Sequence, residues 1–230
     1  MKTLEYRTVD KSSWGDGPWQ SEPDKKQWRD EATGLPCLIV RNQFGALCGY
    51  AGVPKGHRLH GKTYGAEKVF SCTEDRSDDW HHSCTVDSHL EAHGGITFSS
   101  SCAPMGLAAH ARMRDRLAKS KEEAKVYPKG DAARFIQKWE PVIEDHAAWK
   151  AQMEAEAICH VSEAGEPDEV WWFGFDCAHF GDLLPGMAAY MRGDMVSMTE
   201  GLQRDDVYRD LGYVEAQISG LAAQLADLAQ

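Results

Sequence analysis

The run Val170-Trp171-Trp172-Phe173-Gly174-Phe175 is short, free of charge and rich in aromatic residues. These properties are typical of a β-strand that is covered on both faces. Asp176 follows the run directly, and His179 comes three residues later. Polar groups that end a buried strand lie at the rim of a sheet, where clefts form. The run therefore predicts both a strand in the core and a candidate functional site at its end.

Further strands are indicated on the N-terminal side of this run. Residues 35–41 and 46–53 are β-like, and the turn sequence Asn42-Gln43-Phe44-Gly45 separates them, with Gly45 suited to a positive φ. This pattern predicts a β-hairpin. A shorter strand is expected at 95–99. These segments together predict a small, mainly antiparallel sheet.

Helices are expected in two parts of the chain. Residues 104–160 are rich in Ala, Lys, Glu, Arg and Met, which predicts a helical insertion. A long C-terminal helix is predicted over 205–228, behind a possible cap at Asp205, because apolar residues recur there at spacings of four and three. That apolar seam packs on the rest of the fold or makes a homodimer. The prediction is a single α+β domain over residues 1–230.

The first 34 residues carry three tryptophans, Trp14, Trp19 and Trp28, among Gly, Pro and charged residues. Large aromatic side chains favour burial. We therefore expect an ordered arm that wraps the core.

Composition and charge exclude several classes of protein. Hydrophobic residues at 42% and charged residues at 27% are ordinary for a globular chain, and no apolar stretch approaches the length of a membrane span. The net charge of −11 argues against general nucleic-acid binding, which needs a basic surface. The N-terminal residues lack the apolar centre of a signal peptide, and the seven cysteines have no close paired spacing. A reducing cytoplasm is expected.

The segment Gly56-His57-Arg58-Leu59-His60-Gly61-Lys62-Thr63 matches the sequence pattern of a phosphate-binding P-loop. A true P-loop needs a helix that begins at the lysine, and the sequence that follows leaves little room for one. Three interpretations stay open, namely an NTPase, a Gly-rich connection and a cationic loop that binds an anionic ligand. The cationic loop is the predicted ligand site, with side chains from Lys55, His57, Arg58, His60 and Lys62.

A His-rich, acidic segment offers a possible zinc site. Its candidate ligands are Cys72, His81, His82, Cys84 and His89. The segment lacks the Cys-x-x-Cys spacing of a strong zinc motif, and its aspartates favour a solvated loop.

The residues after the apolar strand form the predicted site. Asp176 and His179 are candidate catalytic residues, because a carboxylate and an imidazole at a sheet rim can converge on water. Together with Asp182 and His93, they are also candidate ligands of a divalent metal ion. The alternative is structural, with His179 capping a helix or bonded to Asp176 in the core. Cys177 is either a nucleophile or a small buried cysteine.

Several blocks of the sequence are distinctive, namely 17–19, 22–28, 34–41, 48–57, 93–98, 171–182 and 208–210. On these blocks the chain resembles an uncharacterised family of phage and prophage proteins. The resemblance implies the cytoplasm of a host cell as the setting, and accessory roles such as countering host defence. It implies no particular activity. In that family the position of Thr63 is often acidic, which weakens the P-loop interpretation.

The first of three functional hypotheses is a phage accessory protein that binds a small phosphorylated, nucleotide-like ligand and so sequesters a host defence signal. In it the cationic loop contacts phosphate, and Trp171 or Trp172 stacks on a base. Asp176, His179 and His93 line the same cleft. The second is a metal-dependent hydrolase of a phosphorylated small molecule, with its metal held by His93, Asp176, His179 and Asp182.

The third hypothesis is a protein–protein interaction module that acts through the C-terminal helix. It predicts that Leu211 and Ile218 are exposed in the monomer.

Overall fold

The computed structural model describes residues 1–65, 69–70, 84–103, 107–163, 169–187 and 206–229. The fold is α+β, as predicted, and the chain divides into two compact units. The sheet unit comprises Met1–Cys102 and Ile158–Gln230, and the helical unit comprises Ala103–Ala157. Among the helices in these ranges, none is both long enough and apolar enough to cross a membrane.

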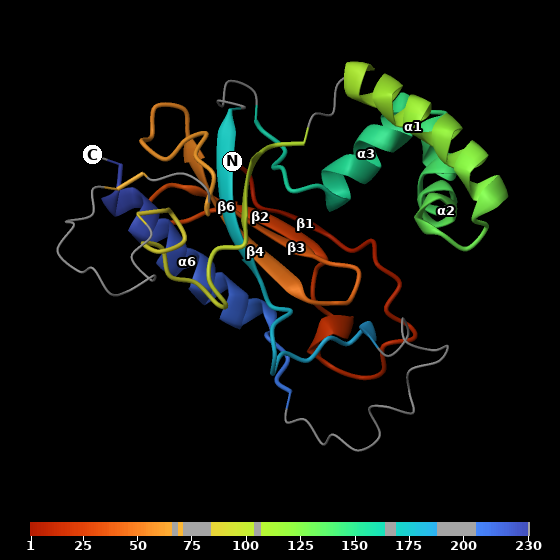
Figure 1. Cartoon of the computed structure of the whole chain (residues 1–230). Helices are drawn as coiled ribbons and strands as arrows, with labels where there is room; N and C mark the ends of the chain where they lie inside the picture. The colour runs from red at the N-terminus through yellow and green to blue at the C-terminus, as the bar shows by residue number, and fades with distance from the viewer. Residues whose placement is uncertain (66–68, 71–83, 104–106, 164–168, 188–205, 230) are drawn as a thin grey trace, which may run out of the picture. The chain divides into compact units, whose positions relative to one another are not determined.

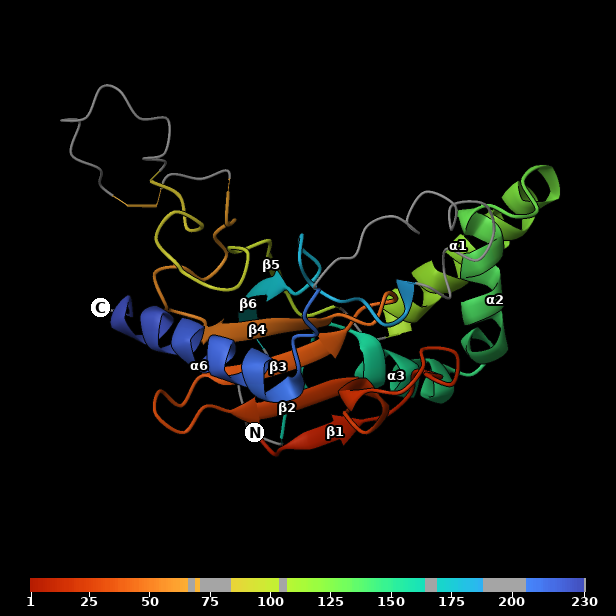
Figure 2. The same cartoon turned by 90° about the horizontal axis from the view of Figure 1, so that it is seen from below.

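Six strands form one antiparallel sheet in the order β1-β2-β3-β4-β6-β5. Figure 1 labels all of them but β5, which Figure 2 shows beside β6. Their bounds are β1 Leu4–Tyr6, β2 Lys25–Arg29, β3 Pro36–Arg41, β4 Leu47–Pro54, β5 Phe98–Ser101 and β6 Val170–Asp176. The predicted hairpin is confirmed as β3 and β4, and Gly45 in its turn has a φ of +91°. The strand predicted at 95–99 begins later than expected, at Phe98.

The N-terminal arm does more than wrap the core, because two of its segments are strands of the sheet. Trp28 lies within β2, and Trp19 lies in the short 3-10 helix η1, Pro18–Gln20, where it is buried. Trp19 packs edge-on against Tyr208, with ring centroids 5.1 Å apart. The arm therefore contacts the chain that precedes the C-terminal helix.

Alternate residues of β6 point to opposite faces of the sheet, as a strand requires. Phe173 and Phe175 belong to the main hydrophobic cluster, which includes the apolar side of α6, Leu211–Asp227. Figure 2 shows α6 lying across this face of the sheet. Val170 and Trp172 belong to a second cluster on the other face. The prediction of a strand covered on both faces is thus confirmed.

The C-terminal helix begins at Leu211, later than predicted. Its cap is Asp210, whose side chain accepts a hydrogen bond from the backbone N–H of Tyr213. The apolar seam packs inward, and Ile218 has no exposed surface. Leu211 is half-buried against the same core. The expectation that this seam is exposed in the monomer is therefore wrong, because the sheet of the same chain covers it.

The helical unit contains three helices, α1 Leu107–Val126, α2 Asp131–Ile143 and α3 His146–Glu156. They have a hydrophobic cluster of their own, centred on the buried side chains of Leu117, Ile143 and Trp149. Helix α2 begins at Asp131, and Pro141 lies inside this helix, which continues to Ile143.

A disulfide joins Cys102 to Cys159, whose Cα atoms are 4.6 Å apart. Both cysteines belong to the sheet unit, and they flank the helical unit almost directly. Because 57 positions separate them, the sequence carried no close spacing that would have indicated this pair. The disulfide therefore links the chain just before the helical unit to the chain just after it.

Arg41, the last residue of β3, carries a guanidinium group with no exposed surface. It donates to Glu22 and Asp24 of the arm, each at 3.0 Å, and to the hydroxyl of Tyr208 at 2.7 Å. The backbone oxygen of Gly45 also accepts from it at 2.9 Å. Burial alone lowers the pKa of Arg41, but Tyr208 and Glu22 outweigh this effect and the pKa is raised. The charge is therefore retained inside the protein.

Replacing Arg41 with alanine should destabilise the sheet unit by about 3–5 kcal/mol, because Glu22 is left buried without its cation and Asp24 keeps only its ion pair with Lys11. Urea unfolding at neutral pH measures the change. The matched control is Arg7→Ala, since Arg7 makes an exposed pair with Glu5 and should contribute less than ~1 kcal/mol. Equal losses in the two variants would contradict the role assigned to Arg41.

Candidate functional site

The candidate site lies at the end of β6, where Asp176 pairs with Cys48 of β4. The chain then turns through His179 to Asp182, which makes an isolated bridge with Val207. His93 enters from the loop that precedes β5. All the residues of the site belong to the sheet unit.

Asp182 is the centre of the site, and its side chain is 2% exposed. One of its oxygens, Oδ2, lies 2.7 Å from Nε2 of His93 and accepts a hydrogen bond from the backbone N–H of His179 at 3.0 Å. The other oxygen accepts from Nε of Arg209 at 2.9 Å. Burial raises the pKa of Asp182, but the hydrogen bonds from His93, Arg209 and His179 outweigh burial, so the pKa lies below its usual value. Asp182 is held as a carboxylate.

His179 points its Nδ1 into the same cluster. This atom is enclosed and has no hydrogen-bond partner among the described residues. It lies 3.9 Å from Oδ1 of Asp176 and 3.9 Å from Oδ2 of Asp182, with no direct hydrogen bond to either carboxylate. The capping alternative does not fit, because no helix begins or ends at His179; its backbone N–H donates to Asp182 within a turn. A buried polar atom without a partner is costly and calls for an explanation.

The ring of His179 rests on the backbone of Gly94. A Cβ atom at Gly94 would lie 2.1 Å from Cε1 of His179, and the φ of Gly94 is +67°. Glycine is therefore needed here both for its conformation and for its lack of a side chain. The rings of His93 and His179 meet edge to face, with centroids 5.4 Å apart.

Asp176 lies beside this cluster and keeps a third of its side chain exposed. Its Oδ2 accepts a hydrogen bond from the Thr97 hydroxyl at 3.1 Å, and its Oδ1 accepts from the backbone N–H of Ala178 at 3.0 Å. These two contacts fix the carboxylate while leaving it accessible to water. Asp176 can therefore act as a base toward a group bound near His179.

Two residues that the sequence analysis missed support the site from outside. The hydroxyl of Tyr213 lies 2.9 Å from Nδ1 of His93, and Arg209 holds the far oxygen of Asp182. Both come from the segment at the start of α6, which the sequence analysis interpreted as an apolar seam. Arg209 belongs to the distinctive block 208–210, and that was the one available signal.

The donor atoms of His93, His179 and Asp182 lie within 4.8 Å of one another. Ligands of one four-coordinate zinc ion lie roughly 3.3 Å apart, so small side-chain movements would bring these three onto one ion. Tyr213 and Arg209 are then the outer contacts that orient such ligands in metalloproteins. Asp176, the fourth predicted ligand, lies next to this set.

Cys177 is buried, and burial together with the nearby carboxylates raises the pKa of its thiol well above the usual range. A nucleophilic cysteine needs the thiolate. Of the two alternatives left open by the sequence, the structure therefore favours a small buried cysteine.

The predicted cationic loop lies away from this cluster. It follows Pro54, which pairs with Val170 at the start of β6, whereas Asp176 ends that strand. Six residue steps along a strand span about 20 Å. The expectation that the loop and Asp176 line one cleft is therefore wrong, because β4 and β6 run antiparallel.

The side chains of the predicted cationic loop make different contacts and do not converge on one point. His57 is buried, with Nε2 2.9 Å from the backbone oxygen of Leu225 and Nδ1 accepting from the N–H of Leu59. Arg58 lies over the ring of Phe70. Lys55 pairs with Glu169 at an exposed position. Lys62 contributes its backbone oxygen to a hydrogen bond from the indole of Trp171, and no helix begins at Lys62.

The stacking role predicted for Trp172 does not fit its position. The ring has no exposed surface, so neither face is open to a base. Trp171 is the accessible member of the pair, and with Lys55 and His60 it lines a cavity of about 340 Å³.

The predicted zinc segment lies mostly outside the described residues, since Cys72, His81 and His82 are not among them. His89 is described, and its ring stacks on Phe70 with centroids 4.0 Å apart.

Gly94→Ala should displace the ring of His179, because the new Cβ would overlap it. Gly95→Ala is the matched control, since Gly95 also has a positive φ, +89°, but a Cβ there meets nothing within 4 Å. Both variants should lose about 1–2 kcal/mol of stability from backbone strain. The NMR signals of the His179 ring should shift strongly in Gly94→Ala alone, and similar shifts in both variants would contradict the packing described.

Comparison with known proteins finds no family model, no curated protein and no solved structure that matches this chain. The functional conclusion therefore depends on the geometry of the site.

Proposed function

We propose that this protein is a metal-dependent hydrolase of a small phosphorylated molecule. The observation that carries the proposal is the enclosed Nδ1 of His179, which has no hydrogen-bond partner among the described residues and faces two carboxylates. Binding to a cation would satisfy this atom. His93 and Asp182 offer the second and third donors at the same place.

Two imidazoles and one carboxylate are a ligand set used by catalytic zinc sites and by iron(II) sites, which keep further positions open for water or substrate. A divalent ion in such a site lowers the pKa of bound water and polarises the oxygen of a phosphoryl or carbonyl group. The outer contacts from Arg209 and Tyr213 keep Asp182 and His93 in place.

Asp176 is the proposed general base. Its carboxylate is fixed by Thr97 and by the backbone of Ala178, and its Oδ1 lies 3.9 Å from Nδ1 of His179. A base in this position can take a proton from a water molecule held close to His179.

The rim of the site offers an apolar surface to a substrate. Phe180 is 89% exposed between His179 and Asp182, and Val207, which is bridged to Asp182, is 52% exposed. An aromatic side chain beside a metal site suits a substrate with a flat base as well as a phosphate. The resemblance to phage and prophage proteins makes signalling nucleotides the first substrates to test.

The protein should bind one divalent ion per sheet unit, and His179→Gln should weaken that binding by at least about tenfold, because one of three ligands is lost. Elemental analysis and calorimetry with zinc, manganese and iron(II) measure the effect. His89→Gln is the matched control, since His89 lies away from the cluster. Equal affinities for the metal ion in His179→Gln and in the wild-type protein would rule out the metal site.

Asp176→Asn should keep the metal but reduce turnover by roughly 10²–10⁴-fold, the usual contribution of a general base. Release of phosphate or nucleotide product from a panel of nucleotides, with and without a chelator, is the measurement. If turnover survives the chelator, or if Asp176→Asn is as active as the wild type, the assigned mechanism is wrong.

A second candidate function is ligand binding at the other end of β6. The observation that favours it is the cavity of about 340 Å³ lined by Lys55, His60 and Trp171. The indole N–H of Trp171 is anchored on the backbone oxygen of Lys62 at 2.9 Å, which fixes the ring. A fixed aromatic ring can stack on a base, and Lys55, which shares the cavity with its partner Glu169, offers an ammonium group to a phosphate.

Under this second function, Trp171→Leu should weaken nucleotide binding by about tenfold or more, the range of one lost stacking contact. Lys55→Ala should weaken it less, and Lys129→Ala, an exposed lysine of the helical unit, should leave it unchanged. Thermal shift is measured with nucleotides in the presence of a chelator, so that binding at the metal site does not contribute to the stabilisation. Stabilisation that survives Trp171→Leu would place the ligand elsewhere.

A further inference from the structure

The disulfide between Cys102 and Cys159 has polar neighbours on the Cys102 side. Nδ1 of His160 lies 3.7 Å from Sγ of Cys102, and the indole N–H of Trp172 donates to the same sulfur at 3.4 Å. Both sulfurs and the imidazole nitrogen lie within 4.8 Å of one another. An imidazole beside a sulfur can donate a proton to a departing thiolate, and an N–H donor stabilises the thiolate.

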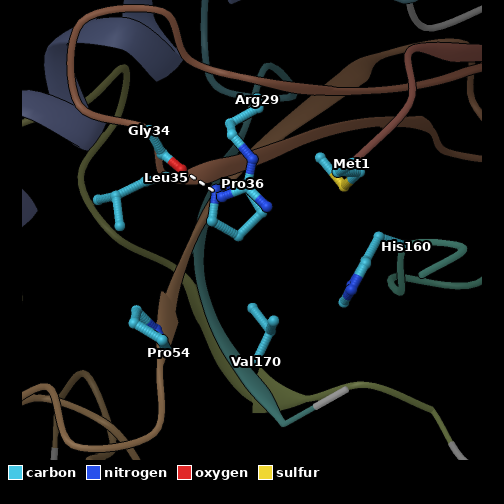
Figure 3. A pocket seen from close by; sticks show the side chains of 8 residues that line it. All are labelled: Met1, Arg29, Gly34, Leu35, Pro36, Pro54, His160 and Val170. Carbon is cyan, nitrogen blue, oxygen red and sulfur yellow. Dashed lines mark hydrogen bonds between the residues drawn. The ribbon is translucent and has the colours of Figure 1, made fainter. Parts of the chain in front are cut away.

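The two sulfurs differ in access. Cys159 is buried, whereas Cys102 is half-buried and lines the cavity that also contains His60 and Trp171. His160 borders a second, smaller cavity of about 110 Å³, and Figure 3 shows its ring beside Pro36 and Val170. A thiol reagent therefore reaches Cys102 first.

Three other cysteines of the sheet unit are unsuited to exchange. Cys37, Cys48 and Cys177 are buried, and burial raises the pKa of Cys37 and of Cys48 to about 12. Thiols of this kind stay protonated and react slowly. The neighbourhood of Cys102 differs in having both a cavity and an imidazole.

We propose that Cys102 and Cys159 form a thiol–disulfide exchange site that reacts with a dithiol, such as a thioredoxin-like protein or a small dithiol. The thiolate of the dithiol attacks Sγ of Cys102 and forms a mixed disulfide. The bond to Cys159 breaks, and Cys159 leaves with the electron pair and takes a proton through His160.

The second thiol of the reagent then attacks its own sulfur in the mixed disulfide. Cys102 leaves as a thiolate next to the indole N–H of Trp172 and takes up the proton that the second thiol releases. The reagent is oxidised to its disulfide, while the protein gains two electrons and two protons. An accessible disulfide with a proton donor at hand is of the labile kind.

The position of the pair gives the reaction a consequence. Cys102 stands directly before the helical unit and Cys159 follows shortly after it, so reduction opens the covalent closure of the segment between them. The reaction thus removes the covalent link between the two ends of the inserted segment.

The test follows reduction of the folded protein by dithiothreitol at neutral pH, with alkylation and peptide mass mapping of Cys102 and Cys159. We expect reduction within minutes while circular dichroism stays unchanged, and a rate lower by roughly tenfold in His160→Asn, because the proton donor is lost. His89→Asn is the matched control and should keep the wild-type rate. His160→Gln provides a second variant if His160→Asn does not fold.

Trp172→Phe keeps the ring but removes the N–H donor, and it should slow the second step, so that the mixed disulfide on Cys102 accumulates. Two outcomes would overturn the proposal. One is a disulfide that is reduced only when the protein unfolds, and the other is an equal rate in wild type, His160→Asn and Trp172→Phe.

Discussion

The buried charge of Arg41 is the constraint on which the rest of the sheet unit depends. A guanidinium group without exposed surface must find acceptors inside the protein, and here they come from two distant parts of the chain and from the adjacent turn. Glu22 and Asp24 come from the arm, and Tyr208 comes from the segment before α6. These parts have to assemble together, because any one of them alone would bury an incompletely paired charge.

Three consecutive residues, Tyr208 to Asp210, connect the buried charge of Arg41 to the candidate site. Tyr208 binds Arg41, Arg209 binds Asp182, and Asp210 caps α6. Glu22 also accepts a hydrogen bond from the backbone N–H of Leu211. The carboxylate at the centre of the site is therefore oriented by a segment that a buried arginine, on another strand, holds in place.

Much of the fold could be predicted from local pattern, and the exceptions have a physical cause. The apolar run of β6 and the turn at Gly45 are signals that sequence carries directly. Strand β2 carries no such signal, because Lys25 and Gln27 are polar and yet fully buried. Gln27 is accommodated because its amide pairs with both backbone groups of Val161, a contact across 134 positions. Hydrogen bonds of this range override local propensity.

The candidate site, too, could be predicted from the sequence only in part. The short spacing of Asp176, His179 and Asp182 at the end of an apolar strand was enough to predict a polar cluster, and His93 joins it. The distance to the cationic loop depends instead on the antiparallel register of β4 and β6, which no residue pattern reveals. Tyr213 faces His93 from a helix whose pattern indicated only apolar packing.

The two ends of the helical unit lie close together, and this closeness affects how the chain can change. The path leaves the sheet at Cys102 and comes back at Cys159, with the two Cα atoms 4.6 Å apart. A segment that departs and returns at one point can be lengthened, shortened or exchanged without altering the strands on either side. The three helices can therefore vary as one module without any change in the strands that carry the polar cluster.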